Sequence, residues 1–182
     1  MTDGFAAVVL AGGAARRMGG VDKTALRVGG RTLLDRTLSA VATADPLVVV
    51  GPHRATESEV RWAREDPPGS GPLAGLAAGL REIAEAELVA VLAADHPGLT
   101  AETISRLRAA VRNSGAVLVD SGGRAQWLQG VWRTEVLRAH MPEQTENRPM
   151  RALFGHLDPV LVPAVGDETA DVDTPEDLRG LR

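Results

Sequence analysis

The sequence predicts an α/β fold with three layers, in which helices cover both faces of a mostly parallel sheet that contains one antiparallel strand. Two observations favour this class. Short, continuous apolar runs of strand length alternate along the chain with segments of helical period. Aromatic residues make up only 3% of a chain that is 44% hydrophobic, so the core must be built from aliphatic side chains. Such runs are typical of strands buried between layers of helices.

The first two thirds of the chain predict four parallel strands and the helices between them. The expected strands are Phe5–Leu10, Pro46–Gly51, Leu88–Ala93 and Gly115–Val119. The expected helices are Arg31–Thr43, Pro72–Glu85 and Thr100–Arg112, each with an apolar stripe on one side. Thr100 is expected to cap the third helix. Repeated strand–helix–strand order predicts right-handed crossovers.

The pattern changes after Val119. Ser121-Gly122-Gly123 is a turn signal, and the following Ala125–Trp132 looks like a strand joined by a short connection, so it is the expected antiparallel member. The remaining expected elements are helices at Arg133–His140, Arg148–Leu157 and Pro175–Gly180, and a short strand at Val160–Pro163. No linker divides the chain, and we expect one domain over residues 1–182.

Composition excludes several classes of function. The formal charge is −4, from 20 Lys and Arg against 24 Asp and Glu, and there is no cysteine. A disulfide framework, a thiol nucleophile and a Cys-ligated metal are therefore excluded. Scarce aromatic residues argue against single-stranded nucleic-acid binding. The apolar runs fall well short of the roughly 20 residues that cross a bilayer, and no secretion signal is recognisable. We expect a cytoplasmic protein with neither membrane nor nucleic-acid partners.

A glycine-rich, basic loop follows the first expected strand, in the stretch Leu10–Lys23 with sequence LAGGAARRMGGVDK. Its glycines let the backbone approach a ligand closely, and successive backbone N–H groups can bind an anion. Arg16, Arg17 and Lys23 add positive charge in an acidic protein, which points to a polyphosphate ligand. The spacing fits neither a P-loop nor the dinucleotide fingerprint. The alternative is a flexible surface loop with solvated arginines.

Motifs along essentially the whole chain resemble the molybdenum cofactor guanylyltransferases, the MobA family. The matching stretches are L-A-G-G-x-x-x-R-M-G from Leu10, Lys23, G-G-R-T-L-L from Gly29, Asp66, G-P-L-A-G from Gly71, A-A-D-H-P from Ala93 and D-V-D-T-P-E-D-L from Asp171. The resemblance implies a Rossmann-like nucleotidyltransferase fold. It also implies transfer of GMP from GTP to the terminal phosphate of molybdopterin, free or already carrying molybdenum, with release of pyrophosphate and with Mg²⁺ as cofactor.

The resemblance also implies roles for particular residues. Those expected to contact GTP are Leu10, Ala11, Gly12, Gly13, Lys23, His53, Asp66 and Asp95. Arg17, Lys23 and Asp95 are expected to be catalytic. A lysine at position 23 would neutralise charge that develops between the α-phosphate and the leaving pyrophosphate. His53 stands where the family often has Asn, and Asp66 is equally natural as a loop carboxylate before two prolines.

Asp95 and Asp173 are the expected metal ligands. Asp95 follows a buried strand at its carboxyl end, where open α/β sheets bind ligands, and Mg²⁺ commonly takes only one or two carboxylates. The alternative for Asp95 is an anchor for the next helix. Asp173 stands in D-V-D-T-P where the family usually has N-x-N-T-P. Its alternative is an ordinary helix start, with Thr174 as the N-cap and Pro175 at the first helical position.

The acceptor site is harder to predict. The candidates for a flat, phosphorylated pterin are Trp127, Gln129, Trp132, Arg133, Arg148 and Arg151. Both tryptophans could instead belong to the core. Cytidylyl transfer to the same pterin, transfer to another phosphorylated acceptor, and a non-catalytic nucleotide-binding protein are the rival functions. The expected state is a monomer or a weak homo-oligomer, with molybdoenzymes or their chaperones as further partners.

Overall fold

The computed structural model describes residues 4–12 and 23–172, and its central layer is a seven-stranded sheet. The strand order is β5-β4-β1-β6-β8-β7-β9. The bounds are β1 (Ala6–Leu10), β4 (Leu47–Val50), β5 (Arg61–Ala63), β6 (Leu88–Ala93), β7 (Gly115–Val119), β8 (Ala125–Arg133) and β9 (Val160–Pro163). Only β8 runs antiparallel to its neighbours β6 and β7. The predicted single antiparallel strand is confirmed.

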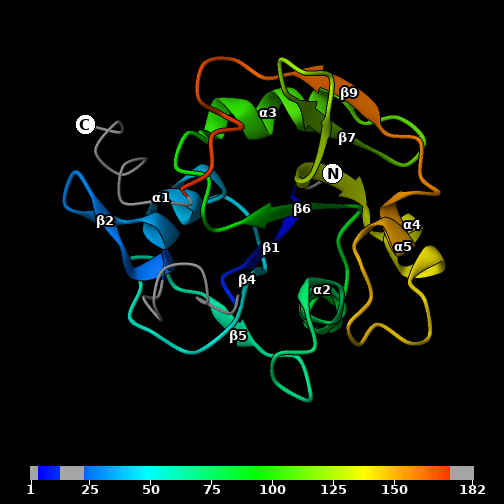
Figure 1. Cartoon of the computed structure of the whole chain (residues 1–182), viewed down its shortest axis with the longest axis horizontal. Helices are drawn as coiled ribbons and strands as arrows, with labels where there is room; N and C mark the ends of the chain where they lie inside the picture. The colour runs from blue at the N-terminus through cyan, green and yellow to red at the C-terminus, as the bar shows by residue number, and fades with distance from the viewer. Residues whose placement is uncertain (1–3, 13–22, 173–182) are drawn as a thin grey trace.

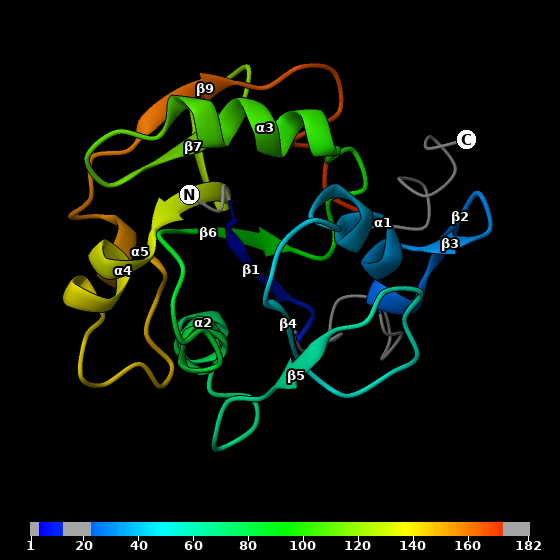
Figure 2. The same cartoon turned by 180° about the vertical axis from the view of Figure 1, so that it is seen from behind.

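Helices cover both faces of this sheet. One face is covered by α1 (Leu33–Ala40) and α3 (Ala101–Ala110). The opposite face is covered by α2 (Pro72–Arg81), α4 (Thr134–His140) and α5 (Arg151–Phe154), as Figures 1 and 2 show from two sides. A short 3₁₀ turn, η2 (Lys23–Ala25), and a two-stranded hairpin of β2 (Arg27–Val28) and β3 (Arg31–Thr32) precede α1. The predicted three-layer architecture is confirmed. None of the helices described is long and apolar enough to cross a membrane.

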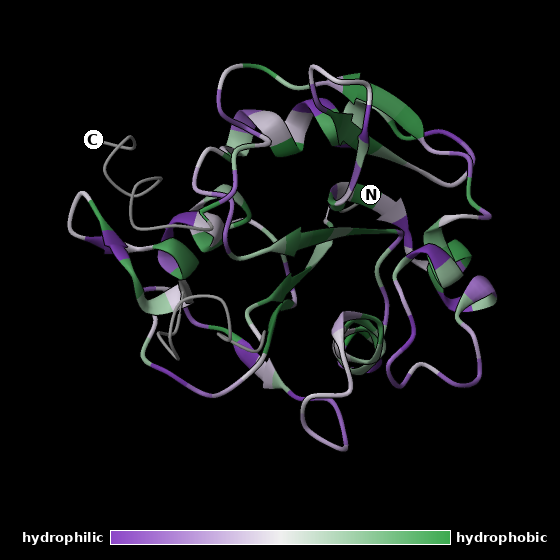
Figure 3. Cartoon of the chain, in the orientation of Figure 1, coloured by the Kyte–Doolittle hydropathy of each residue, from purple (hydrophilic) through white to green (hydrophobic). Residues whose placement is uncertain are grey.

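The core strands are apolar on both faces, as the sequence predicts. Every residue of β1 and β4 is buried, and Figure 3 shows the hydrophobic colouring of β1, β4 and β6 in the middle of the molecule. Alternate residues enter different clusters: Ala7 and Val9 pack toward α1 and α3, whereas Ala6 and Val8 pack toward α2. Each fully buried Val or Leu side chain contributes about 1.5–3 kcal/mol of transfer free energy.

The hand of one crossover differs from the expectation. The chain passes from β1 to β4 over the α1 face and from β5 to β6 over the α2 face, in opposite directions across the sheet, so these two crossovers share one hand. From β6 to β7 the chain crosses the sheet in the same direction as from β5 to β6. The helix of this crossover, α3, nevertheless packs on the face that carries α1, not on the face that carries α2. The third crossover therefore has the opposite hand. Helices α2, α4 and α5 occupy the other face, and α3 packs beside α1 instead.

Local side chains define where the helices begin. Thr32 accepts a hydrogen bond from Asp35 N–H at 3.0 Å and caps α1. Thr100 and Thr103 form a reciprocal capping box at α3, so the predicted N-cap is confirmed. The helices are shorter than the apolar periodicity predicts, because Val41 and Val111 already leave helical geometry after α1 and α3.

Gly79 allows α2 to lie close to the sheet. A Cβ atom at this position would be 2.5 Å from Val8 Cγ1 and 2.9 Å from Val50 Cγ2. Overpacking of this kind costs about 1–3 kcal/mol, and the better helix propensity of Ala offsets about 1 kcal/mol of it. We expect Gly79→Ala to lower the free energy of unfolding in urea, and Gly4→Ala, which has open space around it, to leave it unchanged. A stabilised Gly79→Ala protein would show that α2 moves away without cost.

A buried carboxylate fastens the segment after β9 to α3. Glu168 is only 6% exposed. Its Oε1 accepts from Thr103 Oγ1 at 2.6 Å and from Arg106 at 3.1 Å. Its Oε2 accepts from Arg106 at 2.9 Å and from Val165 N–H at 2.7 Å. Burial raises the pKa of Glu168, but these hydrogen bonds outweigh burial and hold the pKa below the ordinary value of 4.5.

The lowered pKa of Glu168 predicts acid-dependent stability. A carboxylate whose pKa is depressed by folding contributes stability above the unfolded pKa, near 4.5, and loses it as the pH falls through the lower folded pKa. We expect Glu168→Gln to cost about 1.5–3 kcal/mol at pH 7, the range for hydrogen bonds to charged groups. Urea unfolding at several pH values between 7 and 3 should show this difference shrink below pH 4.5. A constant difference would contradict the assignment.

Candidate active site

The order of the strands reverses between β1 and β6. From β1 the chain moves outward to β4 and β5, and α2 then brings it back to β6 on the other side of β1. Ligands of open α/β sheets bind outside the carboxyl ends of the strands at such a switch point. Leu10 pairs with Ala93 as the last register pair, and Ala94 N–H donates to Leu10 O at 3.1 Å. Asp95 therefore emerges beside the segment Leu10–Gly12.

A cavity of about 580 Å³ opens at these strand ends. It lies between the end of β1, the end of β4, the loop before α2 and the connection between α4 and α5. The lining residues are Leu10, Gly12, Val50, Gly51, Pro52, Arg64, Glu65, Pro68, Gly69, Gly71, Pro72, Gly75 and Asn147. Its volume lies within the range of small-molecule sites.

Gly51 sets the narrow spacing between two walls of this cavity. Ala11 N–H donates to Val50 O at 2.8 Å, and Gly51 N–H donates to Ala63 O at 3.0 Å. Gly51 has a φ of 150°, and a Cβ atom there would be 2.9 Å from Ala11 C. Glycine is needed both for this backbone conformation and for the close approach. The wall formed by residues 10–12 is thus held directly against the end of β4.

Helix α2 presents its N-terminus to the cavity. Gly71, with φ 93°, precedes Pro72 at the first helical turn, and both line the cavity together with Gly75. The first turn contains no acidic residue. The unpaired N–H groups and positive dipole end of a helix favour an anion. This wall therefore suits a phosphate group better than a cation.

Asp95 and His96 form a polar pair beyond β6. The Asp95 side chain is 32% exposed, and its Oδ1 lies 2.8 Å from Nδ1 of the largely buried His96. A hydrogen bond from the imidazole would orient the carboxylate, and the Asp95 side chain as a whole stays partly exposed. Within the described part of the chain, no three His, Asp or Glu side chains gather as a metal cluster. One partly exposed carboxylate fits Mg²⁺, which usually completes its shell with water and phosphate oxygens.

Segments that are far apart in the sequence meet at Asp95. Val172 N–H donates to Asp95 O at 3.1 Å, and the fully buried Val172 side chain packs with Val28, Leu33 and Leu26. Leu26 directly follows η2. Leu26 and Val172, which lie close to Lys23 and Asp173 in the sequence, are thus brought to the same end of the sheet as Asp95.

The structure describes only some of the expected nucleotide contacts. Leu10 and Gly12 line the cavity, and Ala11 lies between them. Of Lys23 only the backbone is described, in η2; its neighbour Thr24 is hydrogen bonded to Arg54 beyond β4. Gly13, Arg16, Arg17 and Asp173 lie outside the described residues.

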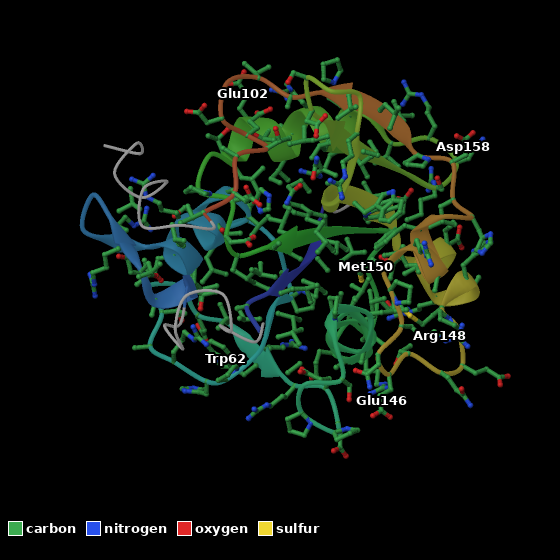
Figure 4. All side chains as sticks on the ribbon, viewed as in Figure 1. Trp62, Glu102, Glu146, Arg148, Met150 and Asp158 are labelled. Carbon is green, nitrogen blue, oxygen red and sulfur yellow. The ribbon has the colours of Figure 1, made fainter. Side chains whose placement is uncertain are left out.

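His53 and Asp66 are exposed next to the cavity rather than in its lining. The ring of His53 lies 5.0 Å from that of Trp62, which is part of β5 and is labelled in Figure 4. Asp66 follows Glu65, which does line the cavity and accepts from Gly69 N–H at 2.9 Å.

The acceptor candidates on β8 separate into different environments. Trp132 is fully buried and packs on Phe154, with ring centroids 4.6 Å apart, so it belongs to the core. Trp127 stacks on the same ring at 6.0 Å. Arg133 pairs with Leu88 at the start of β6, at the opposite end of the strand from Asp95, so it was wrongly proposed for the acceptor site. Gln129 is buried opposite Leu92, and its Oε1 has no hydrogen-bond partner among the described residues.

The connection between α4 and α5 supplies a wall that sequence reasoning missed. Asn147 lines the cavity with φ 54°, and its N–H donates to Ser70 O at 2.7 Å. Asn is among the few residues that tolerate this conformation, which is the one local signal. Arg148 and Arg151 follow it and are exposed. Figure 4 shows Glu146 and Arg148 at the outer side of the molecule.

Comparison with known proteins places the sequence in a family. A family model described as MobA-like NTP transferase domain matches residues 7–160, which contain β1, the cavity and Asp95. The chain belongs to this family. Its MobA-like domain thus includes the whole described cavity, while Val172 and Asp173 lie beyond the matched range.

Individual relatives of the chain are named as molybdenum cofactor guanylyltransferases. The molybdenum cofactor guanylyltransferase of Bradyrhizobium sp. (strain ORS 278) is 38% identical over 136 residues, which cover 69% of this chain and 64% of that protein. The chain therefore spans less than two thirds of that relative in the match. A probable molybdenum cofactor guanylyltransferase of Mycobacterium marinum is 33% identical over 96% of this MobA-like chain and 91% of its own length.

A solved nucleotidyl transferase from Methanothermobacter thermautotroptrophicus has the same fold, with a TM-score of 0.73 and 26% identity. The match covers 98% of this chain and 96% of that protein. Rossmann-like three-layer architecture is therefore common to this MobA-like chain and a nucleotidyl transferase.

Proposed function

We propose that this chain transfers GMP from GTP to the terminal phosphate of molybdopterin, with or without bound molybdenum, and releases pyrophosphate. The observation that carries the proposal is the cavity at the carboxyl ends of β1 and β4, which a glycine backbone and the α2 N-terminus line. Asp95 follows the neighbouring strand β6, whose end pairs with Leu10 of the cavity lining. The names of the relatives support guanylyl transfer to the molybdenum cofactor.

The nucleotide would occupy the cavity, with its base against the backbone of residues 10–12. Gly51 keeps that backbone close to β4, and the positive end of α2 faces the same space. Arg17 and Lys23 would neutralise the phosphates, and His53 and Asp66 would approach from the rim. Most of the rate enhancement in such a transfer comes from positioning and charge neutralisation.

We assign Mg²⁺ to Asp95 and Asp173. When bound, the ion would supply positive charge that neutralises the phosphates as the reaction proceeds. Asp95 supplies a partly exposed carboxylate for this purpose, and His96 holds that carboxylate in one orientation. The acceptor phosphate is itself an anion at neutral pH, so it attacks the α-phosphorus while the bond to pyrophosphate breaks, and no general base is needed.

Pyrophosphate release with GTP, CTP, ATP or UTP, each beside molybdopterin and Mg²⁺, tests this function. We expect release with GTP, and a dinucleotide product of the pterin and GMP by mass spectrometry. Preference for CTP would replace the guanylyl assignment with cytidylyl transfer. GTP binding without turnover would instead indicate a nucleotide-binding protein that lacks transferase activity.

A further inference from the structure

The segment that follows β9 crosses α3 and ends at the metal-binding side of the proposed site. Figures 1 and 2 show it, in orange to red, leaving β9 and passing along α3 toward the end of β6. Ala164 N–H donates to Val119 O at its beginning, and Val172 N–H donates to Asp95 O at its end. We call residues 164–172 the strap.

The strap contacts the turn after Asp95 at two points. A Cβ atom on Gly98 would lie 2.2 Å from Asp167 O and 3.1 Å from Glu168 N, so the two backbones touch there. The second point is the hydrogen bond from Val172 to the Asp95 carbonyl. The position of the strap and the position of the Asp95 turn are therefore coupled through backbone contacts.

Glu168 is the side chain that fixes the middle of the strap. Residues 164–171 are all described, and among them only Glu168 is buried. An apolar anchor would hold the strap on α3 without setting its direction. The carboxylate instead receives fixed donors from Thr103, Arg106 and Val165, and directional hydrogen bonds define one orientation.

We propose that Glu168 is a positioning residue for the metal site. By clamping the strap to α3, it keeps the Val172 N–H on the Asp95 carbonyl and the strap backbone against Gly98, and so holds the turn that carries the Asp95 carboxylate in one position. The inference rests on the proposed function, because it concerns the ion assigned there. Partners that orient metal ligands typically contribute 10–100-fold to metal affinity.

Mn²⁺ affinity in the presence of α,β-methylene GTP tests the role of Glu168 without turnover. Electron paramagnetic resonance should show at least 10-fold weaker binding for Glu168→Gln, and an intermediate loss for Arg106→Gln, which leaves two donors on the carboxylate. Val131→Ala is the control: it removes buried apolar volume opposite Ala90, so it should lower stability and leave the Mn²⁺ affinity unchanged. In turnover assays, the KM for Mg²⁺ should rise more than kcat falls.

The outcomes separate the two proposals. Equal Mn²⁺ affinity in wild type and Glu168→Gln overturns the positioning role, as does a loss that Val131→Ala reproduces. Wild-type protein that binds no Mn²⁺ with the GTP analogue overturns the proposed function instead. If Glu168→Gln does not fold, Arg106→Gln decides: unchanged affinity in that variant overturns the inference.

Discussion

Asp95→Asn is expected to reduce pyrophosphate release with GTP and molybdopterin by about 10²–10³-fold, the usual effect of removing one electrostatic contact to the reacting groups. The substitution keeps the shape of the side chain and removes its charge. Folding should be unaffected, because the side chain is partly exposed and the carbonyl, which accepts from Val172, remains. Initial rates at saturating substrates, together with thermal unfolding, measure both effects.

The matched control for this variant is Asp158→Asn. Asp158 is exposed and precedes β9, at the edge of the sheet opposite the cavity, and Figure 4 shows it at the periphery. We expect wild-type rates from it. If Asp95→Asn retained near-normal turnover in Mg²⁺, the assignment of Asp95 to the ion would be refuted.

Gly51→Ala should weaken GTP binding by at least about 10-fold, equivalent to about 1.4 kcal/mol. Its Cβ would overlap the backbone of Ala11 and would also demand a conformation that side chains rarely adopt. Residues 10–12 must then move away from β4 and widen the cavity. Calorimetric titration with GTP, compared with thermal unfolding, separates lost affinity from lost stability.

Gly30→Ala provides the comparison for Gly51→Ala. Gly30 also has a positive φ, 84°, but its Cβ would meet no atom within 4 Å. This variant should lose stability through backbone strain alone and bind GTP as the wild type does. Unchanged GTP affinity in Gly51→Ala would mean that the nucleotide does not rest on residues 10–12.

The sequence allowed correct prediction of those elements whose signal is local and continuous. The strands β1 and β6 are uninterrupted apolar runs, because both of their faces are covered by helices. Strand β5 was missed because it has only three residues, one exposed and two half-buried, at the edge of the sheet. The hairpin of β2 and β3 was missed for a similar reason, since each strand has two residues.

Site residues divide in the same way. Asp95 could be proposed because it follows a recognisable strand end. Asn147 and Glu168 could not, because their roles depend on contacts with Ser70 and with Thr103 and Arg106, far away in the sequence. The opposite hand of the α3 crossover is likewise a consequence of which face the later helices occupy, and no local pattern encodes that.

The hydrogen bond from Val172 to Asp95 makes the order of synthesis relevant to function. A nascent chain that has reached β9 already contains β1, β4 and β6. The strap is still absent at that stage, so its two contacts with the Asp95 turn, at Gly98 and through Val172, have not yet formed. On the proposed metal assignment, we expect full metal affinity only once the chain includes residue 172 and the strap has packed on α3.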